Sequence, residues 1–194
     1  QVSNYHILVN KAKADQRRLF GTQAVQGPKN GLSSGAAVYV DRLHDTEAPH
    51  TDRPLEPGDE HLQYEIVPGR AAAVVVKGWA ETRIMVITVY LDVDDDLREI
   101  NMAILYEVGE WIACMGLPYV ICGEFNNPTK AISELRWLDS IDGEVVATET
   151  STHWTSRQTE GSIIDYFIVK RCMAPLCRAY TVDREAIPRR PVML

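Results

Sequence analysis

The chain has 194 residues and a formal net charge of −7, with 45% hydrophobic and 24% charged residues. These values are typical of one globular domain with a sizeable core, and the acidic balance argues against a general DNA-coating protein. No apolar run approaches the roughly 18 residues of a membrane span, so no membrane partner is expected.

The four cysteines favour free thiols in a reducing compartment. They show no CxxC pair and no histidine partner at zinc spacing, and Cys122 lies in an apolar segment while Cys114 lies in a helical one. Buried free thiols are therefore favoured over the alternative, a disulfide framework. The N-terminus carries no apolar signal segment, which together with the thiols indicates an intracellular location, cytoplasmic or nuclear. The absence of an initiator Met indicates a fragment or a processed piece.

The first third of the chain mixes one helical pattern with loops. Apolar residues recur on one face of 5–20, which predicts a helix. The composition of 27–35 predicts a loop, the run at 36–40 a strand, and the acidic, proline-containing stretch 41–60 a solvated loop.

The middle of the chain predicts three strands and a long helix. The strands are expected at 64–67, 71–79 and 82–91, and the last is apolar on both faces, which places it centrally in a sheet. One apolar stripe at three- and four-residue steps predicts a helix over 97–115.

The last third is again rich in strands. A helix is expected from after Pro128 to about Leu138. Strands are expected at 119–122, 143–148 and 162–169, with a short edge strand within 187–194. Strands outnumber helices, and the helices fall between groups of strands. The pattern predicts two packed sheets with helices outside, in a single domain over 1–194.

The stretch "CGEFNN", residues 122–127, places polar side chains directly after a buried strand. Gly123 allows a sharp turn, so that the side chains of Glu124 and Asn126 are held at the rim of a sheet. A carboxylate there can bind Mg²⁺, orient water or accept a proton, and an amide two residues on can hold a phosphate oxygen. An ordinary polar turn after a strand is the alternative.

Asp165 lies inside the otherwise apolar "SIIDYFIV". An aspartate in mid-strand is costly unless it is paired or solvated. It is therefore either part of a site or a residue on the exposed face of an edge strand.

These two stretches together resemble the endonuclease/exonuclease/phosphatase superfamily, which includes apurinic endonucleases and deoxyribonuclease I. The resemblance rests on "CGEFN", a following helix, "TH" and "GSIIDYFIV", with "SSGAAVYV", "ITVYL" and "PRRPV" in support. It covers about residues 33–194, with its firm motifs in 84–192. The loop and the strand after it look most like the retroelement endonuclease branch.

The resemblance implies an α+β fold, a four-layer αββα sandwich of the DNase I type, incomplete at its N-terminus. It also implies phosphodiester hydrolysis with Mg²⁺ or Mn²⁺ and nucleic acid as a weak partner. By position, Glu124 matches the acid that orients water and is a candidate metal ligand. Asn126 matches the phosphate-binding amide, Tyr90 the phosphate-contacting tyrosine, and Asp165 the acid that holds a terminal histidine.

Three departures from the family pattern predict that activity is weak or lost. Glu124 stands where the family has Asp, and a displacement of about 1 Å can cost about 100-fold in rate. Arg189 or Arg190 stands where the terminal histidine belongs, and arginine can hold a phosphate but does not shuttle protons. The metal-binding Glu of the family has either become Val2 or lies upstream of the chain. The alternative function is a non-catalytic pseudo-nuclease of retroelement origin that binds nucleic acid or phosphate.

Overall fold

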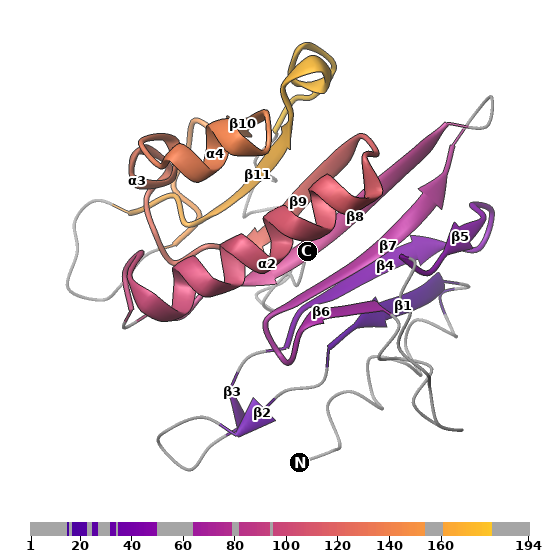
Figure 1. The fold of residues 1–194 in the computed structure, drawn as a ribbon, viewed down its shortest axis with the longest axis horizontal. Coiled ribbons are helices and arrows are strands. Elements are labelled where there is room, and N and C mark those ends of the chain that lie inside the picture. The colour runs from indigo at the N-terminus through magenta and orange to yellow at the C-terminus, as the bar shows by residue number, and fades with distance from the viewer. Residues whose placement is uncertain are drawn as a thin grey trace.

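The computed structural model describes residues 15, 17–22, 25–26, 32–33, 35–49, 64–78, 82–93, 95–153 and 161–179 (Figure 1). The elements within these ranges, in chain order, are β1 (Arg17–Gly21), β2 (Val25–Gln26), β3 (Leu32–Ser33), β4 (Ala37–Asp41), β5 (Thr46–Glu47), β6 (Glu65–Val67), β7 (Ala71–Lys77), β8 (Arg83–Tyr90), α2 (Glu99–Met115), β9 (Tyr119–Glu124), α3 (Thr129–Ser133), α4 (Arg136–Ser140), β10 (Gly143–Val146), β11 (Asp165–Lys170) and the 3₁₀ helix η3 (Arg171–Leu176).

A seven-stranded sheet forms the centre of the molecule, in the order β10-β11-β9-β8-β7-β5, with β6 also paired to β7. Strands β8 and β9 run parallel, and the other pairs in this sheet are antiparallel. A parallel pair needs a long crossover connection, and α2 provides it. The apolar strand β8 lies between β7 and β9, as its pattern predicts.

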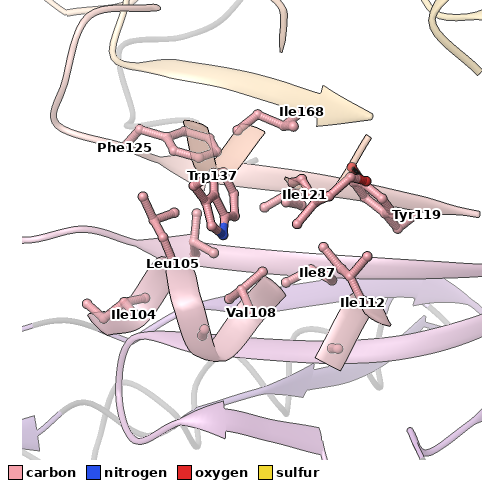
Figure 2. Close-up of a cluster of buried hydrophobic side chains, with 14 of the residues drawn as sticks. Ile87, Ile104, Leu105, Val108, Ile112, Tyr119, Ile121, Phe125, Trp137 and Ile168 are labelled. Carbon is pink, nitrogen blue, oxygen red and sulfur yellow. Dashed lines mark hydrogen bonds between the residues drawn. The ribbon is translucent and has the colours of Figure 1, made fainter. Parts of the chain in front are cut away.

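The helices cover one face of this sheet and enclose the main core (Figure 2). The apolar stripe of α2, which includes Leu105 and Val108, packs on alternate residues of the strands, such as Ile87 and Ile121. Trp137 of α4 lies in the same cluster and is 3% exposed. Burial of this stripe explains why α2 forms where the three- and four-residue spacing predicts it.

A second, two-stranded sheet packs against the opposite face. Strands β1 and β4 pair antiparallel, and Phe20 and Val40 from them pack on Val74 of β7. The described residues thus supply a helix layer and two facing sheets. The predicted α+β sandwich is confirmed.

The predicted helix over 5–20 is wrong at its end, because residues 17–20 belong to β1. Leu19 pairs with Tyr39 and Phe20 with Val38 in the β1–β4 ladder. As part of β1, Phe20 packs in the core between the two sheets. This strand pairing outweighs the helical spacing of 5–20, which is only approximate. Residues 5–14 of the predicted helix and the edge strand within 187–194 lie outside the described residues.

The predicted helix after Pro128 is two short helices, α3 and α4. Leu135 between them is extended, with φ −76° and ψ 131°. This break lets both Ile132 and Trp137 reach the core, which a straight helix of this length would not do.

Three smaller predictions also need correction. Strand β11 begins at Asp165 and not at 162, and the acidic loop contains the short strand β5. All four cysteines are free, as predicted, but Cys114 and Cys172 are exposed. Among the described residues, no helix has the length and apolar character to cross a membrane.

Candidate functional site

Three of the predicted site residues form one row across the sheet, where β8 and β9 end and β11 begins. In the strand registers, Tyr90 of β8 pairs with Glu124 of β9, and Glu124 pairs with Asp165 of β11. Side chains alternate along a strand, and the neighbours Val89 and Tyr166 lie in the core under the helices. The row therefore faces away from the helices, toward the side where the second sheet packs.

Gly123 is the residue that makes this row possible. Its φ is +147°, and a Cβ placed on it would lie 1.9 Å from the carbonyl oxygen of Val89. Any side chain would push β9 away from β8 at the level of the site. The glycine therefore brings Glu124 directly beside Tyr90.

Asn126 lies in the turn after β9 and points back to the end of β8. Its φ is +51°, a left-handed conformation that asparagine tolerates better than most residues. Its Nδ2 donates a hydrogen bond of 2.8 Å to the carbonyl oxygen of Leu91. Its side chain also lies close enough to those of Glu124 and Tyr90 to lower the pKa of each. The amide thus lies beside both side chains of the row.

A buried aromatic pair anchors the turn that carries Glu124 and Asn126. Phe125 is fully buried, and its ring stacks on that of Tyr166 with centroids 4.2 Å apart. The Tyr166 hydroxyl donates to the carbonyl oxygen of Asn127 at 3.1 Å. The alternation of Phe125 inward with Glu124 and Asn126 outward fixes these two candidate side chains on a rigid base.

Thr152 anchors the first residue of β11. Its hydroxyl oxygen accepts hydrogen bonds of 3.1 Å from the backbone N–H groups of both Ile164 and Asp165. The N–H of Phe125 donates to the carbonyl oxygen of Ile164 at 2.8 Å. These hydrogen bonds engage the backbone before Asp165 with Thr152 and Phe125, so the regular strand β11 starts only at Asp165.

The row carries two neighbouring carboxyl groups, and this affects the protonation of Glu124. Burial raises the pKa of Glu124, and the negative charge of Asp165 raises it further. The Asn126 side chain and the nearby His153 act in the opposite direction. Burial also raises the pKa of Tyr90, with Glu124 adding to the rise. A bound cation would relieve the repulsion between the carboxylates of Glu124 and Asp165.

The two carboxylates fit a weakly held divalent cation. Mg²⁺ is commonly bound by one or two carboxylates, with water and substrate phosphate as its other ligands. Glu124 and Asp165 can supply these two. Within the described part of the chain, no group of three or more His, Cys, Asp or Glu side chains is placed to hold a metal.

Arg70 completes the row and was not predicted from the sequence. The N–H of Tyr90 donates to the carbonyl oxygen of Arg70 at 2.8 Å, and the Arg70 guanidinium lies 5.4 Å from the centroid of the Tyr90 ring. In the sequence, Arg70 is marked only by its place directly before β7. This place becomes informative once the pairing of β7 with β8, the strand of Tyr90, is known. Arg189 and Arg190, the predicted phosphate ligands, lie outside the described residues.

Solved structures that resemble this fold include an exonuclease and a phosphatase. The 3'-5' exonuclease NExo from Neisseria meningitidis matches with a TM-score of 0.57 and 15% identity over 93% of this chain and 78% of that one. A Neisseria 3' phosphatase NExo bound to a product DNA hairpin matches with a TM-score of 0.53 and 15% identity, over 86% of this chain and 72% of that one. An endonuclease/exonuclease/phosphatase family protein from Bacteroides thetaiotaomicron matches with a TM-score of 0.52 and 13% identity, over 86% of this chain and 66% of that one.

The chain therefore has the DNase I-like fold of the endonuclease/exonuclease/phosphatase proteins. At these identities, the likeness defines the fold alone. No family sequence model and no curated protein matches the chain by sequence.

Proposed function

We propose that this chain is a nuclease-like domain that binds phosphodiesters, with nucleic acid as its ligand class, and that its metal-dependent hydrolysis is weak or lost. The observation that carries the proposal is the row of Tyr90, Glu124 and Asp165 at one end of the sheet, with the Asn126 amide beside it. The fold and the DNA product bound to one structural neighbour support nucleic acid as the ligand class.

Each residue of the row has a role that its chemistry permits. The Asn126 amide and the Tyr90 hydroxyl donate hydrogen bonds to non-bridging phosphate oxygens. Glu124 orients the attacking water, and its raised pKa places it closer to neutral pH as a proton acceptor. Asp165 adds a second carboxylate beside it.

Glu124 and Asp165 would hold Mg²⁺ or Mn²⁺, and the ion would supply positive charge that neutralises charge on the phosphate. Among the described residues, no group of three or more His, Cys, Asp or Glu side chains is placed to hold a metal, which supports weak metal binding. The longer side chain of Glu124, compared with the Asp of the resemblance, displaces the carboxylate by about 1 Å and supports slow chemistry.

The basic stretch near the C-terminus supplies the remaining groups. Either Arg189 or Arg190 pairs with Asp165 in a charge-assisted interaction, in place of a proton-shuttling histidine. The loop and strand motifs support a retroelement endonuclease as the origin of the domain.

A plasmid-nicking assay with Mg²⁺ or Mn²⁺, run beside DNA binding by fluorescence anisotropy, tests the proposal. The natural chain is expected to bind duplex DNA weakly, with an affinity that falls steeply from about 50 mM to about 200 mM salt, and to nick it very slowly or not at all. Asn126→Ala removes the central amide and is expected to weaken binding about 5-fold.

The control is Ser140→Ala, which removes a neutral polar side chain exposed on α4, among the helices on the other face of the sheet from the proposed row. Robust nicking by the natural chain that Asn126→Ala abolishes would refute the weak-activity part of the proposal. Binding that is unaffected by Asn126→Ala would refute the site itself.

A further inference from the structure

Arg70 is held in a defined position beside the proposed site. It ends the turn that joins β6 to β7, where its N–H donates to the carbonyl oxygen of Val67 at 2.9 Å. Its guanidinium lies over the Tyr90 ring, 5.4 Å from the ring centroid, and forms a 2.8 Å ion pair with Asp92, and its side chain is 14% exposed. The planar group is therefore clamped between an aromatic face and a carboxylate.

The carboxylate that holds Arg70 is itself fixed by α2. The side chain of Asn101, which is fully buried, accepts a hydrogen bond of 2.6 Å from the N–H of Asp92 and donates one of 2.8 Å to its carbonyl oxygen. The N–H of Asn101 donates to Asp95 at 2.7 Å. A continuous chain of contacts thus connects the start of α2, through Asp92 and Arg70, to the Tyr90 ring.

Stability alone does not explain a guanidinium at this position. Burying a charged group carries a desolvation penalty, and an apolar side chain of similar size would cover the Tyr90 ring without it. The Nη1 atom of Arg70 is buried and has no hydrogen-bond partner among the described residues, which adds to the penalty. What arginine provides and an apolar residue does not is a fixed planar cation beside the tyrosine.

We propose that Arg70 is a positioning residue for phosphate recognition, which holds the Tyr90 ring so that its hydroxyl faces Asn126 and Glu124. Arg70 acts through Tyr90 and does not contact the phosphate. The inference rests on the proposed function, because it assigns a role to Tyr90 in that site. The inference is consistent with the electrostatics of Tyr90. Burial and Glu124 raise the pKa of Tyr90, and the Arg70 guanidinium partly offsets this rise.

A double-mutant cycle on DNA binding tests this role. The variants are Tyr90→Phe, Arg70→Met and the two combined, and the probe is a fluorescein-labelled DNA duplex of about 20 base pairs with Mn²⁺ at about 50 mM salt. Tyr90→Phe keeps the ring and loses the hydroxyl, and is expected to weaken binding about 5-fold. Arg70→Met is expected to weaken binding by a similar factor in the natural background and by less than about 2-fold in the Tyr90→Phe background.

Two further variants separate positioning from charge and from folding. Arg70→Lys keeps the charge but not the planar guanidinium, and is expected to recover less than half of the affinity that Arg70→Met loses. Asp92→Asn releases the guanidinium while preserving side-chain shape, and is expected to reproduce the Tyr90-dependent loss. Thermal unfolding of each variant identifies any that does not fold, in which case Asp92→Asn replaces Arg70→Met in the cycle.

The outcomes distinguish this inference from the proposed function. If Arg70→Met weakens binding equally in both backgrounds, or if Arg70→Lys restores it fully, the guanidinium acts on DNA directly and the inference is refuted while the site stands. An unchanged affinity for Arg70→Met in the natural background also refutes it. If Tyr90→Phe and Asn126→Ala both bind like the natural chain, the proposed function itself fails.

Discussion

Replacing Gly123 by alanine should separate the two strands that carry the site. The added Cβ would lie 1.9 Å from the Val89 carbonyl oxygen, whereas carbon and oxygen in contact lie about 3.3 Å apart, so the strands must part by about 1.4 Å. The positive φ of +147° adds strain of about 1–3 kcal/mol, because side chains rarely adopt it. Together with weakened ladder hydrogen bonds, the expected loss of unfolding free energy is about 4 kcal/mol.

Gly116→Ala is the matched control. Gly116 also has a positive φ, +61°, but a Cβ there would meet nothing within 4 Å. Only the backbone strain remains, about 1 kcal/mol. For a chain of this length, the two losses correspond to falls in melting temperature of about 12 °C and about 3 °C.

Urea unfolding followed by tryptophan fluorescence measures both variants. If Gly123→Ala is no less stable than Gly116→Ala, the close approach of β8 and β9 is wrong, and with it the placement of Glu124 beside Tyr90.

The remaining predictions concern one titrating group and two buried side chains. The pKa of Glu124 is raised above its usual 4.5, so between the two pKa values the folded protein holds a proton on Glu124 that the unfolded chain has lost. The stability that the protonated Glu124 contributes is therefore lost as pH rises through the folded pKa. The stability of Glu124→Gln relative to the natural chain should therefore be greater at about pH 7 than at about pH 4 by urea unfolding, and an equal difference at both would contradict the raised pKa. Asn101→Leu removes the two hydrogen bonds that the Asn101 side chain makes with the backbone of Asp92 and should cost about 2–3 kcal/mol, whereas a cost below about 1 kcal/mol would show that water replaces these bonds. Trp137→Ala removes a ring that is 3% exposed and should lower the free energy of unfolding by about 3–5 kcal/mol. Trp137→Phe should lower it clearly less, because the indole Nε1 has no hydrogen-bond partner to lose among the described residues. Equal losses for the two variants would contradict this.

Segments with strong local patterns were predictable from the sequence. Helix α2 follows from its single apolar stripe, and the central place of β8 follows from apolar residues on both of its faces. The predicted helix ending at residue 20 failed because the strand pairing of β1 with β4 depends on residues about twenty positions apart. Short-range spacing contains no information about such a partner.

The proximity of the candidate site residues was predictable where polar residues interrupt an apolar strand. Glu124, Asn126 and Asp165 each break such a pattern, and the structure brings all three to one end of the sheet with Tyr90. Arg70 was not predictable, because an arginine in a turn is usually solvated and nothing local marks it as buried. Its position follows only from the β7–β8 register, which sets it opposite Tyr90.

Backbone amide chemical shifts, measured while a short DNA oligonucleotide and Mg²⁺ are added to the ¹⁵N-labelled chain, test the central claim most directly. The account predicts that the largest changes fall on the ends of β8 and β9 and the start of β11, at Tyr90, Gly123–Asn127 and Asp165, and that Asn126→Ala reduces them. Changes centred on the opposite end of β9, in the hollow beside Gly116 and Tyr119, would contradict the account, as would an absence of change at Glu124 and Asp165.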